Sequence, residues 1–187
     1  PLTRMKLQIA FIKDKDLAYK LSEDINEMEK MLNEYLQFTS STFLEKNEQF
    51  NISDLIKDII IKYNNENIIM NISNNIFVNG KKNLIRRCMN NLIDNAIKYG
   101  NKVNIEVKKN NNNLFIVLED NGPGIPENEY ENVFKPFYKI DKGRAESKSS
   151  VGLGLSIASD IIRSHGGNIK LDKSSMNGLS VKIFLPV

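Results

Sequence analysis

The chain has 187 residues, which is enough for one or two domains. Hydrophobic residues (41%) and charged residues (26%) occur in the proportions of an ordinary soluble globular protein. The net charge of +3 is too small to indicate a nucleic-acid partner. With one cysteine, Cys88, and one histidine, His165, the sequence excludes an intrachain disulfide and a histidine-rich metal site. No apolar run is long enough to cross a bilayer, and no signal peptide is visible.

Residues 1–42 are predicted to form two helices. The first has apolar residues at the spacing of a coiled-coil seam, namely Leu2, Met5, Ile9 and Ile12. Charged residues interrupt this pattern at 13–16, and the second helix carries a similar stripe: Leu21, Ile25, Met28, Leu32 and Tyr35. One hairpin cannot bury both stripes, so a second copy completing a four-helix bundle is the most economical partner. The alternative is that the stripes pack on the rest of the same chain.

From Glu48 the pattern becomes that of an α+β domain. We expect helices at 53–63, where Ser53 would be the cap, at 82–99, at 127–134 (short) and at 152–164. We expect strands at 50–52, 68–72, 76–78, 103–107, 114–118, 168–171 and 179–185. An asparagine-rich turn at 109–113 would join two of them. This order predicts helices packed on one face of a mixed sheet.

The helix at 82–99 carries the first group of candidate site residues. Asn91, Asn95 and Lys98 recur at intervals of four and three, so their side chains share one face. A carboxamide oxygen is a suitable ligand for Mg²⁺, which keeps several waters and bridges phosphates. The alternative is an ordinary solvated helix face.

A second segment, Glu119-Asp-Asn-Gly-Pro-Gly-Ile-Pro126, comes directly after an apolar strand. An aspartate at a strand end, here Asp120, can accept a hydrogen bond from an exocyclic amine such as that of adenine. The two glycines, Gly122 and Gly124, remove side chains where backbone must approach a ligand. Alone, the segment is also compatible with a simple turn.

Two more segments complete the candidate site. Phe134 and Phe137 flank a proline and could wall a base pocket, although aromatic side chains are more often part of the core. Gly152 and Gly154 precede a helix, where backbone N–H groups can point at a phosphate with help from the helix dipole.

In order and spacing, the four segments resemble the N, G1, F and G2 boxes of the ATPase domain of sensor histidine kinases. The resemblance covers the whole chain. The opening Pro-Leu-Thr-Arg-Met-Lys resembles the part of the family's dimerisation helix just after the phosphoacceptor motif. Asp24-Ile-Asn-Glu27-Met28 resembles the second helix of that hairpin, and His165-Gly-Gly the segment after the last helix. The resemblance implies a Bergerat-type α/β sandwich, and consistently no Walker motif is present.

The resemblance also implies ATP and Mg²⁺ as ligands. Asn91 would bind Mg²⁺, with Asn95 beside it, and Asp120 would hold the adenine amine. By position, the nucleotide-binding residues would be Asn91, Asn95, Lys98, Tyr99, Asp120, Gly122, Gly124, Ile125, Phe137, Lys139, Arg144, Gly152, Leu153, Gly154 and Leu155. Residues 139–150 would form the lid over the nucleotide, with Arg144 available to the γ-phosphate.

The sequence departs from the family pattern in two places. Ser150 and Lys139 stand where the family often has glycine and arginine, and lysine lacks the planar fork that grips phosphate. The phosphoaccepting histidine of the family lies upstream of a proline like Pro1, and His165 is no substitute because it comes after the last helix. We therefore expect a fragment of a longer protein.

The resemblance implies that residues 1–42 are a partial dimerisation hairpin and residues 43–187 an ATP-binding catalytic domain. The enzyme would phosphorylate its own histidine and then an aspartate of a response regulator. Expected partners are a second copy through residues 1–42 and a receiver domain, with no nucleic acid. A membrane is expected only through an upstream region, which would hold the catalytic part in the cytoplasm. The alternatives are a nucleotide-binding module without phosphotransfer and another ATPase of the same fold.

Overall fold

The computed structural model describes residues 2–64, 66–140 and 152–187. The chain begins with a helical hairpin, α1 (Leu2–Ile9) and α2 (Lys15–Leu44). A break between two helices is confirmed, but it lies at 10–14 and not at the predicted 13–16, so Ile12 is outside α1. Asp14 caps the start of α2. Its Oδ1 accepts hydrogen bonds from the backbone N–H groups of Asp16 and Leu17, both at 3.0 Å.

A five-stranded mixed sheet comes after the hairpin, in the order β2–β4–β5–β7–β6. Its strands are β2 (Ile68–Ile72), β4 (Val103–Asn110), β5 (Asn113–Asp120), β6 (Asn168–Lys173) and β7 (Leu179–Pro186). Only the β2–β4 pair is parallel among the pairs described. Along β5, and along β4 as far as Val107, every second residue is buried, as expected for a sheet covered on one face. β1 (Glu48–Asn51) and β3 (Phe77–Gly80) form a separate antiparallel pair.

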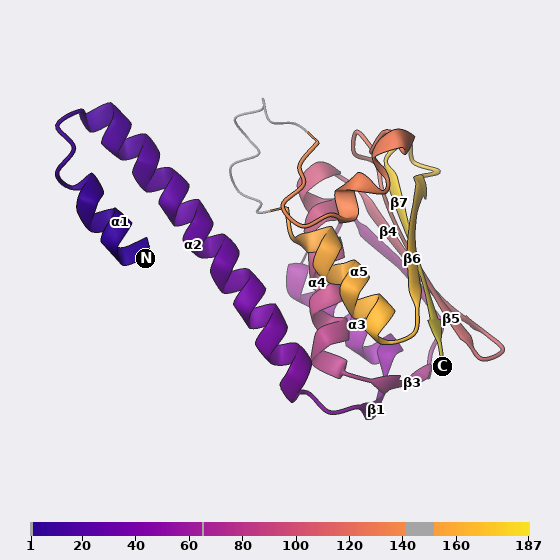
Figure 1. The fold of residues 1–187 in the computed structure, drawn as a ribbon. Helices are drawn as coiled ribbons and strands as arrows, with labels where there is room; N and C mark the ends of the chain where they lie inside the picture. Colours follow the sequence, from indigo (N-terminus) through magenta and orange to yellow (C-terminus); the bar gives the residue numbers. More distant parts are fainter. Residues whose placement is uncertain (1, 65, 141–151) are drawn as a thin grey trace.

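Three helices, α3 (Ile52–Tyr63), α4 (Lys82–Tyr99) and α5 (Gly154–Ser164), lie together on one side of the sheet (Figure 1). Their apolar stripes and the inward residues of the strands form one core cluster. The hairpin lies on the same side, beyond these helices (Figure 1). The predicted α+β arrangement, with helices on one face of a mixed sheet, is therefore confirmed.

Three local predictions are wrong. The strand predicted at 50–52 is β1 at Glu48–Asn51, and Ile52 is the first residue of α3. The cap of α3 is Asn51, whose Oδ1 accepts from the N–H groups of Ser53 (3.0 Å) and Asp54 (3.4 Å). Ser53 is buried instead, and its hydroxyl binds the backbone of Ser73 and Ile76, which tethers α3 to the loop before β3. The short helix expected at 127–134 consists of two separate 3₁₀ turns, η1 (Glu127–Glu129) and η2 (Asn132–Phe134).

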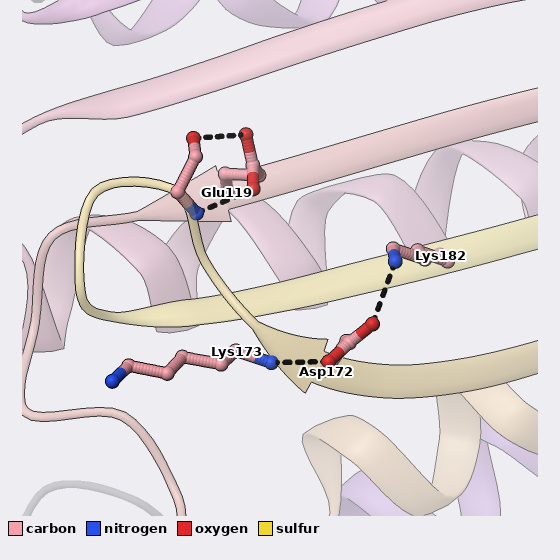
Figure 2. Close-up of polar contacts among 5 residues, drawn as sticks. Glu119, Asp172, Lys173 and Lys182 are labelled. Carbon is pink, nitrogen blue, oxygen red and sulfur yellow. Dashed lines mark hydrogen bonds and ion pairs between the residues drawn. The ribbon is translucent and has the colours of Figure 1, made fainter.

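The sheet face opposite the helices carries polar side chains. Lys182 Nζ in β7 lies 2.7 Å from Asp172 Oδ2 in the neighbouring strand β6 (Figure 2). This hydrogen bond lowers the pKa of Asp172. Glu119 accepts hydrogen bonds from the backbone and hydroxyl of Ser175 at 3.0 and 3.1 Å. Such surface pairs are typical of a solvated sheet face.

The apolar stripe of α2 remains largely uncovered. Ile25 is buried, but Met28, Leu32 and Tyr35 are exposed, so the residues that the structure describes leave them uncovered. No helix within the described part of the chain is long and apolar enough to span a bilayer.

Candidate functional site

The site is built around Asp120, the last residue of β5, which is only 5% exposed. Its Oδ1 accepts hydrogen bonds from the backbone N–H groups of Gly122 at 2.8 Å and Leu179 at 3.2 Å. Burial raises the pKa of this carboxyl, and the two hydrogen bonds partly offset that effect. Both hydrogen bonds use Oδ1, and a carboxylate can accept further hydrogen bonds. Asp120 can therefore accept a hydrogen bond from an amine of a ligand.

Three glycines make room for Asp120. A Cβ on Gly178 would lie 2.2 Å from the Asp120 carbonyl oxygen, and a Cβ on Gly122 would lie 2.6 Å from that of Tyr99. A Cβ on Gly100 would lie 3.0 Å from Asp120 Cβ. Backbone from three loops therefore surrounds the carboxylate where no side chain would fit. We refer to Gly100, Gly122 and Gly178 as the glycine cradle.

Two members of the cradle are absent from the residues predicted from the sequence. Gly178 comes from the loop before β7, and its sequence signal is the turn dipeptide Asn177-Gly178. Gly100 directly follows α4, at a position where glycine commonly ends a helix. Neither signal indicates that the residue packs against Asp120, because that contact depends on the fold.

The predicted residues of α4 and the start of α5 are brought together. Asn91 Nδ2 donates to the Gly154 carbonyl oxygen at 3.4 Å. A Cβ on Gly154 would lie 3.3 Å from Asn95 Nδ2, so both amides face the entry to α5. The Asn91 Oδ1 keeps its acceptor capacity, and one carboxamide oxygen suits Mg²⁺, which binds few protein ligands and keeps its waters. The described residues hold no cluster of three or more His, Cys, Asp or Glu side chains that would compete for such an ion.

Lys98 and Tyr99 lie at the end of α4 and are exposed. The Lys98 ammonium is 5.2 Å from the centre of the Tyr99 ring, a cation–π contact. Gly124, with φ +69°, passes the carbonyl of Gly178, and a Cβ there would be 3.3 Å from that oxygen. Ile125 is the next residue and is half-buried, so it lies at the edge of the same loop.

Two residues that flank the predicted lid, 139–150, are joined to each other. The Phe137 N–H donates to the Gly152 carbonyl oxygen at 2.9 Å. Both residues have left-handed backbone, with φ +66° and +76°, and a Cβ on Gly152 would lie 2.9 Å from the Tyr138 carbonyl oxygen. Arg144, predicted to reach the γ-phosphate, lies outside the described residues. Leu153 is buried, so only its backbone is available to a ligand, whereas Leu155 is partly buried against the core.

A hydrogen-bond network that the sequence does not indicate fixes residues 137–138, which lead into the predicted lid and which we call the lid base. The Tyr138 hydroxyl donates to Glu129 Oε2 at 2.6 Å, and Asn132 Nδ2 donates to the same oxygen at 3.0 Å. These hydrogen bonds lower the pKa of Glu129, and the hydrogen bond to Glu129 raises the pKa of Tyr138. The network ties η1, η2 and the start of the lid into one unit.

Lys139, a predicted phosphate ligand, has a different partner. Its Nζ lies 2.9 Å from Glu27 Oε1, in helix α2 of the hairpin. The pair joins residues 112 positions apart in the chain.

The single histidine and the single cysteine of the sequence both have structural roles. His165 Nε2 accepts from the Lys81 N–H at 3.0 Å, and Nδ1 donates to the Ile161 carbonyl at 2.7 Å, which connects the end of α5 to the start of α4. Cys88 is fully buried in α4, and burial raises the pKa of its thiol to about 12. Both ring nitrogens of His165 are therefore engaged, and Cys88 packs as a small hydrophobe.

The chain is similar in sequence to sensor histidine kinases. The chain is 29% identical over 188 residues to the sensor histidine kinase GtrS of Pseudomonas aeruginosa, covering 100% of this chain and 39% of that protein. It is 32% identical over 211 residues to the sensor histidine kinase WalK of Bacillus subtilis, covering 100% of this chain and 34% of that protein. This chain thus spans well under half the length of these relatives.

A solved structure supports the fold. The catalytic domain of the histidine kinase ThkA, in a nucleotide-free form, is 25% identical, with a TM-score of 0.66 over 75% of this chain and 95% of that one. The Bergerat-type sandwich and the histidine-kinase resemblance are confirmed. The family described as histidine kinase-, DNA gyrase B-, and HSP90-like ATPase matches residues 80–187, more than half of the chain. The chain belongs to that ATPase family.

Proposed function

We propose that this chain is the ATP-binding catalytic core of a sensor histidine kinase of a two-component system. The observation that carries the proposal is the position of Asp120. It is a buried carboxylate, oriented by two backbone N–H groups and enclosed by the glycine cradle. Such an acceptor, next to backbone without side chains, suits the exocyclic amine and flat face of adenine.

The other residues suit the rest of the nucleotide. Asn91, beside Gly154, would hold Mg²⁺, with Asn95 next to it. When bound, Mg²⁺ neutralises phosphate charge. The start of α5 lies beside Asn91, and a helix start presents free backbone N–H groups and a dipole that favour an anion. Lys98 and Tyr99 lie at the end of α4, where they can approach the sugar and phosphates.

The γ-phosphate would pass to a histidine outside this sequence and then to an aspartate of a response-regulator receiver domain. Positioning and charge neutralisation account for most of the catalysis in phosphoryl transfer, and the site residues suit both tasks. In the longer protein, an upstream region would anchor the kinase in a membrane, with this part in the cytoplasm.

Residues 1–42 would mediate a homodimer, and residues 43–187 would form the catalytic domain. The exposed stripe of Met28, Leu32 and Tyr35 supports this assignment, because a second hairpin could cover it as a four-helix bundle. A monomeric mass for this chain in analytical ultracentrifugation at high concentration would count against the assignment.

Calorimetric titration with a non-hydrolysable ATP analogue, with and without Mg²⁺, tests the nucleotide site. Saturable binding that Mg²⁺ strengthens is the expected result. If no heat is seen at millimolar analogue, the proposed site is not functional. If the analogue binds, restoring an upstream histidine distinguishes a kinase from a nucleotide-binding module, because only a kinase forms phosphohistidine.

A further inference from the structure

One face of helix α2 contacts the ATPase domain. Glu27 forms the ion pair with Lys139, and Met31, four residues later and so on the same helix face, packs against the domain core. The side chains of Glu27 and Lys139 are 37% and 27% exposed. An ion pair with this much solvent contact is weak and can exchange partners.

The end of α2 has a second and different connection to the domain. Glu45 directly follows α2, and its two carboxylate oxygens accept the backbone N–H groups of Asn83 (2.6 Å) and Leu84 (3.2 Å). These groups belong to the first turn of α4, where a carboxylate is also favoured by the helix dipole. Glu45 therefore anchors the base of α2 to the helix that carries Asn91 and Asn95.

The two contacts differ in what could break them. The hydrogen-bond donors to Glu45 are backbone N–H groups, which the start of a helix always presents. The partner of Glu27 is instead the side chain of a lysine next to the lid base. Lys139 is two positions beyond Phe137, so its backbone lies within about 7 Å of the hydrogen bond between the Phe137 N–H and the Gly152 carbonyl. A bound polyphosphate there would offer this ammonium several negative charges in place of one.

We propose that the Glu27 carboxylate and the phosphates of a bound nucleotide compete for Lys139, so that the Glu27–Lys139 ion pair is a latch between hairpin and ATPase domain. This inference rests on the nucleotide site proposed above. Nucleotide binding opens the latch, and the closed latch weakens nucleotide binding by the same factor, because the coupling between two binding events is reciprocal. With the latch open, α2 stays attached at Glu45, about 26 Å further along the helix by its rise per residue.

Nucleotide affinity of the whole chain tests the competition. Glu27→Gln removes the competing charge at nearly constant size, and we expect it to tighten binding of a non-hydrolysable ATP analogue about two- to fivefold, the range of a weak ion pair. Glu29→Gln is the matched control. Glu29 makes its ion pair with Lys6 inside the hairpin at 2.6 Å, so the same charge change should leave affinity at the parent value. Equal affinities for the parent and both variants would overturn the competition.

A distance measurement tests the latch without relying on nucleotide. Spin labels on Lys20→Cys in α2 and Arg163→Cys in α5, both exposed, report the separation of hairpin and domain, while native Cys88 is buried. We expect a narrow distance distribution in the parent, and a broader and longer one in Glu27→Gln or with the ATP analogue. The Glu29→Gln control should match the parent.

The outcomes separate the two proposals. If Glu27→Gln leaves the distribution unchanged, the latch is refuted even if nucleotide binds. If the distribution broadens in Glu27→Gln but the parent binds no nucleotide, the ion pair does hold the domains together. The proposed nucleotide site then fails, and the competition fails with it.

Discussion

Gly178 lies so close to Asp120 that a Cβ on the glycine would be 2.2 Å from the Asp120 carbonyl oxygen and 2.3 Å from its Oδ1. The two residues come from different strand ends, β5 and the loop before β7. The contact brings the N–H of Leu179 onto the carboxylate at 3.2 Å. Gly178 thus lets the loop before β7 complete the surroundings of the proposed adenine acceptor.

Gly178→Ala should therefore displace this loop. The added methyl group would meet backbone atoms that cannot rotate away, and we expect a loss of about 1–3 kcal/mol in the free energy of unfolding, together with weaker nucleotide binding. Urea denaturation and calorimetry measure the two effects. Gly166→Ala is the control. Its φ of +74° strains any side chain, but among the described residues a Cβ there would meet one atom, Pro186 Cγ at 3.5 Å. It should cost stability and leave affinity unchanged.

Asp120→Asn should separate stability from binding. The amide keeps an oxygen for the Gly122 and Leu179 N–H groups but loses the charge, so binding of adenine nucleotide should weaken by about 1.5–3 kcal/mol, roughly 10- to 150-fold. Unimpaired binding of the ATP analogue by this variant would show that Asp120 does not hold the adenine.

Asp120→Asn should weaken nucleotide binding without lowering the free energy of unfolding at neutral pH. Because burial raises the pKa of Asp120 above its ordinary 3.8, the protonated form is favoured in the folded state. The stability contributed by the proton is present below pH 3.8 and is lost as pH rises through the folded value. The asparagine variant should therefore be at least as stable as the parent at neutral pH, and this advantage should disappear on acidification. Thermal unfolding at several pH values measures it.

Asn91→Ala should remove the effect of Mg²⁺ on nucleotide affinity. Its one hydrogen bond to Gly154, at 3.4 Å, is long, so the fold should tolerate the loss. Titrations with and without Mg²⁺ should give nearly the same affinity in this variant and different affinities in the parent. Asn90→Ala, one position earlier on another side of α4, should retain the parent's Mg²⁺ dependence. Retention of that dependence in Asn91→Ala would contradict the metal assignment.

Tyr138→Phe should change the titration of Glu129. The Tyr138 hydroxyl is the largest cause that lowers the pKa of Glu129 below its ordinary 4.5, so the variant's Glu129 should titrate at higher pH. The stabilisation from this bond is present above pH 4.5 and is lost as pH falls through the lower folded pKa. The stability difference between parent and variant should accordingly shrink in acid.

Carboxyl-carbon NMR measures the Glu129 titration directly. Tyr130→Phe is the control, since the Tyr130 hydroxyl makes no hydrogen bond to Glu129 among those described. An unchanged Glu129 pKa in Tyr138→Phe would mean that the bond does not persist in solution.

Local periodicity predicted most of the secondary structure. The helix at 82–99 is observed with those bounds, because its apolar residues keep the 3.6-residue period without interruption by glycine or proline. The strand at 68–72 also has its predicted bounds. The sequence does not identify the cap of α3, because Asn51 and Ser53 are both good caps. The choice between them depends on Ser73 and Ile76, which bind the serine instead.

The candidate site was predictable only where its residues form local motifs. Asn91 and Gly154 were both predicted and do meet, and Asp120 lies at a strand end as expected. The contacts of Gly178 with Asp120 and of Lys139 with Glu27 join distant segments, and no local pattern encodes such pairs. Interactions of this kind become visible only when the sheet order and the position of the hairpin are known.

Glu45 has a practical consequence for dividing the chain. The first turn of α4 obtains two of its hydrogen bonds from a residue that precedes β1, at the exit from the hairpin. A catalytic fragment or a chimera with a foreign input module should therefore begin no later than Glu45. A fragment that starts at β1 would keep the strands but leave the N–H groups of Asn83 and Leu84 without this carboxylate. The stability of such fusions is therefore expected to depend on whether the junction lies before or after Glu45.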